Sequence, residues 1–113
     1  MKRYAMIFRS TRTLTADELQ RRAVEIQDWV KQVSSKGIAL DPRMLGETVS
    51  RLSMDNDEIT ERSSPDDPAL LTIVYFDAQN HEQALSVARI HPGLRYGTAI
   101  EVREWNAPQA AAR

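Results

Sequence analysis

The chain contains no cysteine among its 113 residues. Disulfide bonds, thiolate nucleophiles and cysteine-based zinc or iron–sulfur sites are therefore excluded. The two histidines, His81 and His91, have no paired spacing that favours a metal, and a haem would require one of them as an axial ligand. The four glycines form neither a phosphate-binding loop nor a dinucleotide-binding fingerprint. We therefore expect neither a metal nor a cofactor.

An excess of one charge is also missing, since 15 basic residues face 16 acidic ones. Nucleic-acid binding requires a basic excess or a basic patch, so no nucleic-acid partner is expected. No apolar run approaches the ~20 residues that span a bilayer. The apolar stretch near the N-terminus is too short for a secretory signal. These features predict a cytoplasmic protein with no membrane partner.

The segment from Thr15 to Lys36 is expected to be a long helix. Thr15-Ala-Asp-Glu18 is a capping box at its start, and Gly37 is suited to the left-handed position just beyond its end. Apolar residues then recur at steps of four and three, which is the spacing of one helical face. The residues of this predicted buried face are Leu19, Ala23, Ile26, Val30 and Val33.

A second helix is expected from Asn80 to Ile90. Asn80 is the predicted N-cap, and Gln83 completes a capping box. Pro92-Gly93 ends the helix. The residues expected to share its buried face are Ala84, Val87, Ala88 and His91.

Several shorter segments have the composition of β-strands. The segment Ala69 to Phe76 is the most apolar, which predicts a central strand buried on both faces. Residues 55–57 predict the turn of a polar hairpin at a sheet edge. Gly37 to Pro42 is expected to be a short extended piece that ends in a turn. The expected strands are Arg3–Arg9, Glu47–Met54, Glu58–Arg62, Ala69–Phe76 and Thr98–Trp105.

The order of these elements predicts a ferredoxin-like α+β fold, a split βαβ arrangement with an antiparallel sheet and two helices on one face. Residues 1–106 are the expected domain, and 107–113 are an expected frayed tail. The strands Tyr4–Phe8 and Leu70–Phe76 are apolar on both faces, while two helices cover only one. We therefore expect a second copy of the chain to cover the other face, giving a homodimer.

Several motifs, taken in order, resemble the YCII-related (DGPF-type) family. They are Arg3-Tyr-Ala-Met-Ile-Phe8, Val33-Ser-Ser-Lys-Gly37, Phe76-Asp-Ala78, His81-Glu-Gln-Ala-Leu85, Ala88-Arg-Ile-His-Pro92 and Ile100-Glu-Val-Arg103. The resemblance implies a dimeric α+β barrel in which two sheets pack face to face. The DGPF signature is absent, however. The His–Asp pair that some members use is also absent: the first helix has no histidine, and the residue before Pro92 is His91 rather than aspartate.

His91 is the candidate catalytic residue, because an imidazole near a cleft can act as acid or base at neutral pH. The alternative is a structural role at the helix end. Arg9, Glu101 and Arg103 are candidate ligand-binding residues facing the space between the sheets, and surface salt bridges are the alternative. The sequence thus supports two hypotheses. One is a small dimeric protein that binds a polar or aromatic metabolite in a cleft between sheet and helices, with or without acid–base chemistry. The other is a non-catalytic dimerisation and protein-interaction module.

Overall fold

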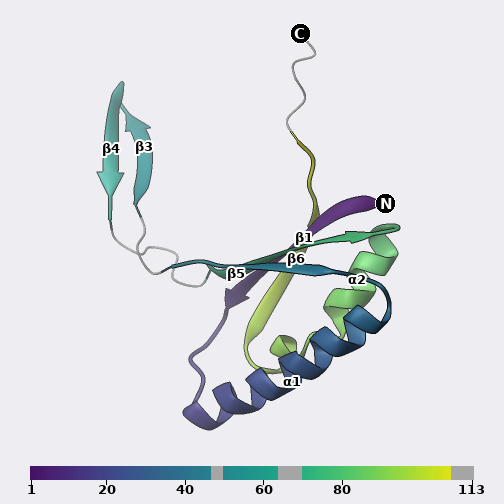
Figure 1. Cartoon of the computed structure of the whole chain (residues 1–113). Helices are drawn as coiled ribbons and strands as arrows, with labels where there is room; N and C mark the ends of the chain where they lie inside the picture. The colour runs from purple at the N-terminus through teal and green to yellow at the C-terminus, as the bar shows by residue number, and fades with distance from the viewer. Residues whose placement is uncertain (47–49, 64–69, 108–113) are drawn as a thin grey trace.

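The computed structural model describes residues 1–46, 50–63 and 70–107 of the chain. Figure 1 shows its helices and strands in chain order. They are β1 (Lys2–Ser10), α1 (Ala16–Ser35), β2 (Leu40–Met44), β3 (Arg51–Asp55), β4 (Glu58–Arg62), β5 (Leu70–Ala78), α2 (His81–Arg89), the 3₁₀ helix η1 (Pro92–Arg95) and β6 (Thr98–Glu104).

Four of the strands form one antiparallel sheet in the order β2-β5-β1-β6. Both α-helices lie against the same face of this sheet (Figure 1). Sheet order and helix placement together give the ferredoxin-like α+β fold that the sequence predicts. Within the described ranges, no helix combines the length and the apolar character needed to cross a membrane.

The ends of α1 follow the sequence prediction closely. The Thr15 hydroxyl accepts a hydrogen bond from the Glu18 amide at 3.1 Å, and the Glu18 carboxylate accepts one from the Thr15 amide at 3.1 Å. Both arms of the capping box are therefore present. Gly37 follows the helix with a φ of +81°, the left-handed conformation in which glycine is not penalised.

The buried face of α1 differs from the predicted one. Leu19, Ala23 and Val30 are exposed, whereas Trp29 and Val33 are buried. The stripe that meets the sheet is made of residues 22, 26, 29 and 33, which also recur at steps of four and three. Two apolar stripes of similar spacing compete on this helix, and the large indole of Trp29 gives the second stripe more apolar area to bury.

The edge of the sheet also differs from the prediction. β2 runs from Leu40 through Pro42 and pairs with β5, so Pro42 does not end the extended segment. β2 has a neighbour on one side only, and an edge strand tolerates a residue without an amide hydrogen. The predicted hairpin does form, although its expected first residues, 47–49, lie outside the described part.

The hairpin of β3 and β4 is a separate two-stranded sheet and not an edge of the main one. Figure 1 shows it standing away from the four-stranded sheet. Its turn residues Asn56 and Asp57 both have positive φ, the pattern of a type I′ hairpin turn.

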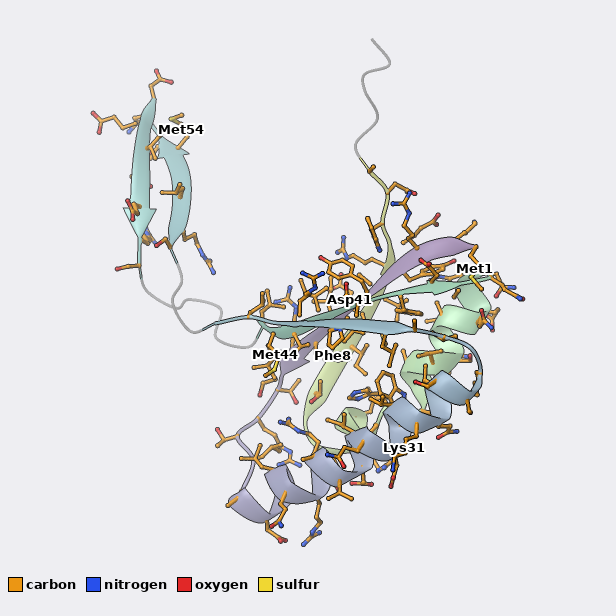
Figure 2. All side chains as sticks on the ribbon, viewed as in Figure 1. Met1, Phe8, Lys31, Asp41, Met44 and Met54 are labelled. Carbon is orange, nitrogen blue, oxygen red and sulfur yellow. The ribbon has the colours of Figure 1, made fainter. Side chains whose placement is uncertain are left out.

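The core lies between the helices and the sheet. Tyr4, Met6 and Phe8 of β1 alternate with Ala5 and Ile7, and the even-numbered set faces the helices. In Figure 2, Phe8 and Met44 project from the sheet towards α1, whereas Asp41 lies on the opposite side. The residues predicted to form the buried face of the second helix are all buried: Ala84, Val87 and Ala88 within α2, and His91 just beyond its end.

We predict that Val74→Asp, in the middle of β5, prevents folding. Val74 is 4% exposed. An unpaired carboxylate there costs several kcal/mol, which is comparable with the total stability of about 5–15 kcal/mol for such a domain. Circular dichroism during thermal unfolding is the measurement. Val24→Asp is the matched control because Val24 is 57% exposed on α1. A Val74→Asp protein that melts like the control would contradict the assignment of Val74 to the core.

Candidate functional site

His91 lies in the turn between α2 and η1, where its ring packs between two aromatic side chains. The centroid of the ring is 4.8 Å from that of Phe8 on β1 and 4.6 Å from that of Trp29 on α1, the latter in an edge-on arrangement. The side chain is 5% exposed. His91 therefore stands where the sheet, α1 and the end of α2 converge, on the helix side of the sheet.

The backbone of η1 determines which nitrogen of His91 carries the proton. The Gly93 amide donates a hydrogen bond to Nδ1 at 2.9 Å. A neutral imidazole that accepts at Nδ1 must carry its hydrogen on Nε2. Glycine is required at position 93, since a Cβ there would lie 2.8 Å from Nδ1.

Burial, and to a smaller extent the positive charge of Arg22, together lower the pKa of His91 to about 4 from its ordinary value of 6.5. At neutral pH the ring is therefore uncharged, with Nε2 as a donor. A helix C-terminus raises the pKa of a nearby histidine, whereas apolar neighbours lower it. The apolar neighbours dominate at His91, because Phe8 and Trp29 cover most of the ring and leave little of it exposed to water.

A cavity of about 520 Å³ lies beside His91, between α1 and the sheet. Its size is in the range of small-molecule sites. The polar side chains on its wall are Arg22, Thr72, His91 and Thr98. Apolar side chains form most of the remainder, among them Phe8, Ile26, Trp29, Leu40, Leu71 and Val74.

Two of these residues, Arg22 and Trp29, were not predicted from the sequence as site residues. The Trp29 indole donates a hydrogen bond to the Val87 carbonyl at 3.1 Å, which ties α1 to α2. Arg22 lies two helical turns before Trp29 and is half-buried at the cavity wall. Both residues share a helical spacing of four and three with Ile26 and Val33, and this spacing was the available sequence signal. The signal was hard to recognise because an arginine is not expected within a buried helical face.

The predicted ligand-binding residues Arg9, Glu101 and Arg103 do not line this cavity. The register of β1 with β6 puts Ile7 opposite Glu101 and Arg9 opposite Ala99, so all three lie on the face of the sheet away from the helices. The Glu101 carboxylate forms an ion pair with Arg103. The structure therefore separates these residues from His91 by the thickness of the sheet.

The same open face bears a short row of apolar and aromatic side chains. Tyr75 packs edge-on against Trp105 at 5.5 Å between ring centroids, and the Arg3 guanidinium lies 4.8 Å from the Trp105 ring centroid. Ile7 and Ile73 are neighbours across β1 and β5 and are half-buried. An Asp41–Arg43 ion pair of 3.0 Å borders the face at β2.

The other histidine, His81, is exposed at the first position of α2. Its ring centroid lies 6.0 Å from that of Tyr4. Across residues 1–46, 50–63 and 70–107, no three histidine, aspartate or glutamate side chains are grouped closely enough to hold a metal ion.

No family model matches the chain, and no curated protein matches it. Among solved structures, the chain is similar to a de novo designed protein, Ferredog-Diesel, with 10% identity, a TM-score of 0.47 and coverage of 91% of this chain and 84% of that one. It is also similar to the divalent ion tolerance protein CutA1 from Ehrlichia chaffeensis, with 13% identity, a TM-score of 0.32 and coverage of 97% and 88%.

We predict that the stability of the protein decreases as the pH falls from about 6.5 to 4. The unfolded chain binds a proton at His91 near pH 6.5 and the folded chain only near pH 4. The unfolded state therefore holds more protons in this window, and the loss reaches at most roughly 3 kcal/mol. Urea unfolding at a series of pH values measures it.

His91→Asn tests the origin of this pH dependence. The asparagine oxygen can accept the Gly93 amide hydrogen bond but does not titrate. We expect the variant to lose most of the decrease between pH 6.5 and 4. The matched control is His81→Asn at the exposed start of α2, which should retain it. An unchanged slope in His91→Asn would show that other groups cause the pH dependence.

Proposed function

We propose that this protein is a homodimer that binds a small molecule in the His91 cavity, and that this molecule is mainly apolar or aromatic with a polar end. One observation supports the site most directly. A buried, uncharged imidazole lines a cavity of about 520 Å³ whose wall is otherwise mainly apolar. Ligand sites commonly combine such apolar walls with a few polar groups that fix orientation.

The Nε2 hydrogen of His91 is the group that would meet the ligand. Nδ1 is occupied by the Gly93 amide, and no described residue accepts a hydrogen bond from Nε2. In the described part of the chain, the only fully buried side-chain nitrogen or oxygen without a partner is Trp105 Nε1. It follows that Nε2 can be reached from solvent.

This tautomer favours recognition over proton abstraction. To act as a base, Nε2 would have to lose its hydrogen to Nδ1, and the Gly93 amide would then face a second donor. We therefore propose that His91 orients the ligand as a hydrogen-bond donor. On the motifs quoted above, we also propose that the chain is a divergent relative of the YCII-related family that lacks its His–Asp pair.

We predict that the neutral probe 2-naphthamide binds in this cavity, as measured by isothermal titration calorimetry and by NMR shifts of the His91 ring. Ile26→Trp should abolish binding because the larger side chain occupies space at the cavity wall. Val24→Trp, on an exposed position of the same helix, should bind the probe normally. Equal binding by both variants, or no binding to the unmodified protein by either 2-naphthamide or the acid of the same shape, 2-naphthoate, would refute the site.

The homodimer is supported by the open face of the sheet. Its centre is apolar, with Ala5, Ile7, Ile73 and Tyr75 side by side across β1 and β5. The Asp41–Arg43 and Glu101–Arg103 ion pairs flank this centre at the two edge strands. An apolar centre with a charged rim is the usual anatomy of a protein interface.

We predict that Ile73→Asp produces a folded monomer. A carboxylate at the centre of this face would be buried without a partner in the dimer but solvated in the monomer. Light scattering after size exclusion should give 12.8 kDa for the variant and twice that mass for the unmodified protein. Leu52→Asp, an exposed position of β3, is the control and should stay dimeric. An unmodified protein that is monomeric in dilute buffer would overturn the dimer.

The second hypothesis, a protein-interaction module, is favoured by the β3–β4 hairpin. Leu52, Met54 and Ile59 share one face of it and are 65%, 66% and 71% exposed. Isolated two-stranded hairpins are marginally stable in water, so this apolar face would gain from a partner. The calorimetric result with 2-naphthamide separates the two hypotheses, since an interaction module has no need of a ligand in the His91 cavity.

A further inference from the structure

Arg22 is the unusual residue of the cavity wall, because it is the charged one among mainly apolar lining residues. Arg22 is half-buried on α1 among mainly apolar neighbours. A charge in such a position is expected to have an opposite charge nearby. In the described ranges of the chain, no carboxylate lies within ion-pair distance of Arg22.

The acids that could have paired with Arg22 along the helix are engaged elsewhere. Glu18, one turn earlier, binds the Arg12 guanidinium through both oxygens at 3.2 and 2.9 Å. Glu25, three residues later, accepts from Arg95 at 2.6 Å and from the Tyr96 hydroxyl. These contacts lower the pKa of both acids, to about 2 for Glu18, so each is ionised and already has its partner. Within the described part of the chain, Arg22 is therefore a residue of the cavity wall whose positive charge has no ion-pair partner.

His91 has the complementary property on the same wall. Its ring is close enough to Arg22 for that charge to affect its protonation. It remains a neutral donor at Nε2, as described above. Besides the hydroxyls of Thr72 and Thr98, the cavity wall thus offers a cationic donor, Arg22, and a neutral one, His91 Nε2, and none of its described lining residues is a carboxylate.

We propose that the ligand of this cavity is a monocarboxylate with a flat apolar body, its carboxylate bound by Arg22 and by His91 Nε2. This inference rests on the proposed function and specifies its ligand class. The planar guanidinium matches the geometry of a carboxylate. The aromatic rings of Phe8 and Trp29 provide the surface for the apolar body. A single arginine suits one negative charge, whereas a phosphate dianion would call for a second cation.

The test compares two probes of the same shape, 2-naphthoate and 2-naphthamide, by isothermal titration calorimetry at neutral pH. The proposal expects the acid to bind about tenfold to a hundredfold more tightly than the amide, because it gains a charge-assisted hydrogen bond. Arg22→Gln should remove this preference and leave the affinity for the amide nearly unchanged. Arg22→Lys should restore part of the preference, because it returns the charge without the planar fork.

Arg21→Gln is the matched control for these variants. Arg21 is the adjacent residue of α1, but it is exposed and pairs with Asp17 away from the His91 cavity. This variant should keep the full preference for the acid.

The outcomes separate this inference from the proposed function. Equal binding of acid and amide, with both lost in Ile26→Trp, would overturn the carboxylate ligand and leave the cavity as a ligand site. A preference for the acid that survives Arg22→Gln would overturn the role of Arg22. Failure of both probes to bind would overturn the ligand site itself and the inference with it.

Discussion

The contact of Trp29 with the end of α2 is the interaction on which the arrangement of this protein depends. The indole donates to the Val87 carbonyl and meets the His91 ring edge-on. These contacts fix the C-terminal half of α1 on the sheet and also bury the ring of His91. The N-terminal half of α1 is held instead by polar contacts of Glu25 with Arg95 and Tyr96, and its apolar residues Leu19 and Val24 remain exposed. The cavity lies between α1 and the sheet and Trp29 is one of its lining residues, so the same tryptophan that closes the core also borders the site.

Local signals in the sequence predicted the parts of the fold that local interactions determine. The capping box at Thr15 and Glu18, the glycine after α1 and the buried face of α2 all appear as expected. Tertiary packing determined which of the two stripes of α1 is buried. The helical periodicity of the sequence gives no information on this packing. The same holds for β2: its pairing with β5 determines its length, and Pro42 is acceptable only because the strand lies at an edge. The hairpin was predicted from its turn, but whether it would join the main sheet depends on contacts distant in sequence.

The site was predictable only in part, for a related reason. His91 was found because it continues the apolar face of α2. Arg22 was not predicted as a site residue, because its role follows from the absence of a carboxylate partner among the described residues. This absence is evident only from the structure, in which Glu18 and Glu25 bind other groups. Arg9, Glu101 and Arg103 were correctly expected on strands, yet strand alternation puts them on the face away from the helices. Their predicted role as ligand-binding residues between two sheets stays a prediction, because it requires the second sheet that the proposed homodimer would supply.

The two tryptophans of the chain lie on opposite sides of one sheet. Trp29 contacts His91 on the helix side, and Trp105 packs against Tyr75 and Arg3 on the open side. Indole fluorescence responds to the polarity and charge of its immediate surroundings. The emission of each tryptophan therefore depends on the environment at its own face of the sheet. Replacing Trp105 with phenylalanine would leave an emission that monitors the cavity alone, and the difference between this emission and that of the unmodified protein would monitor the open face. Events on the two faces can therefore be followed separately without attaching any label.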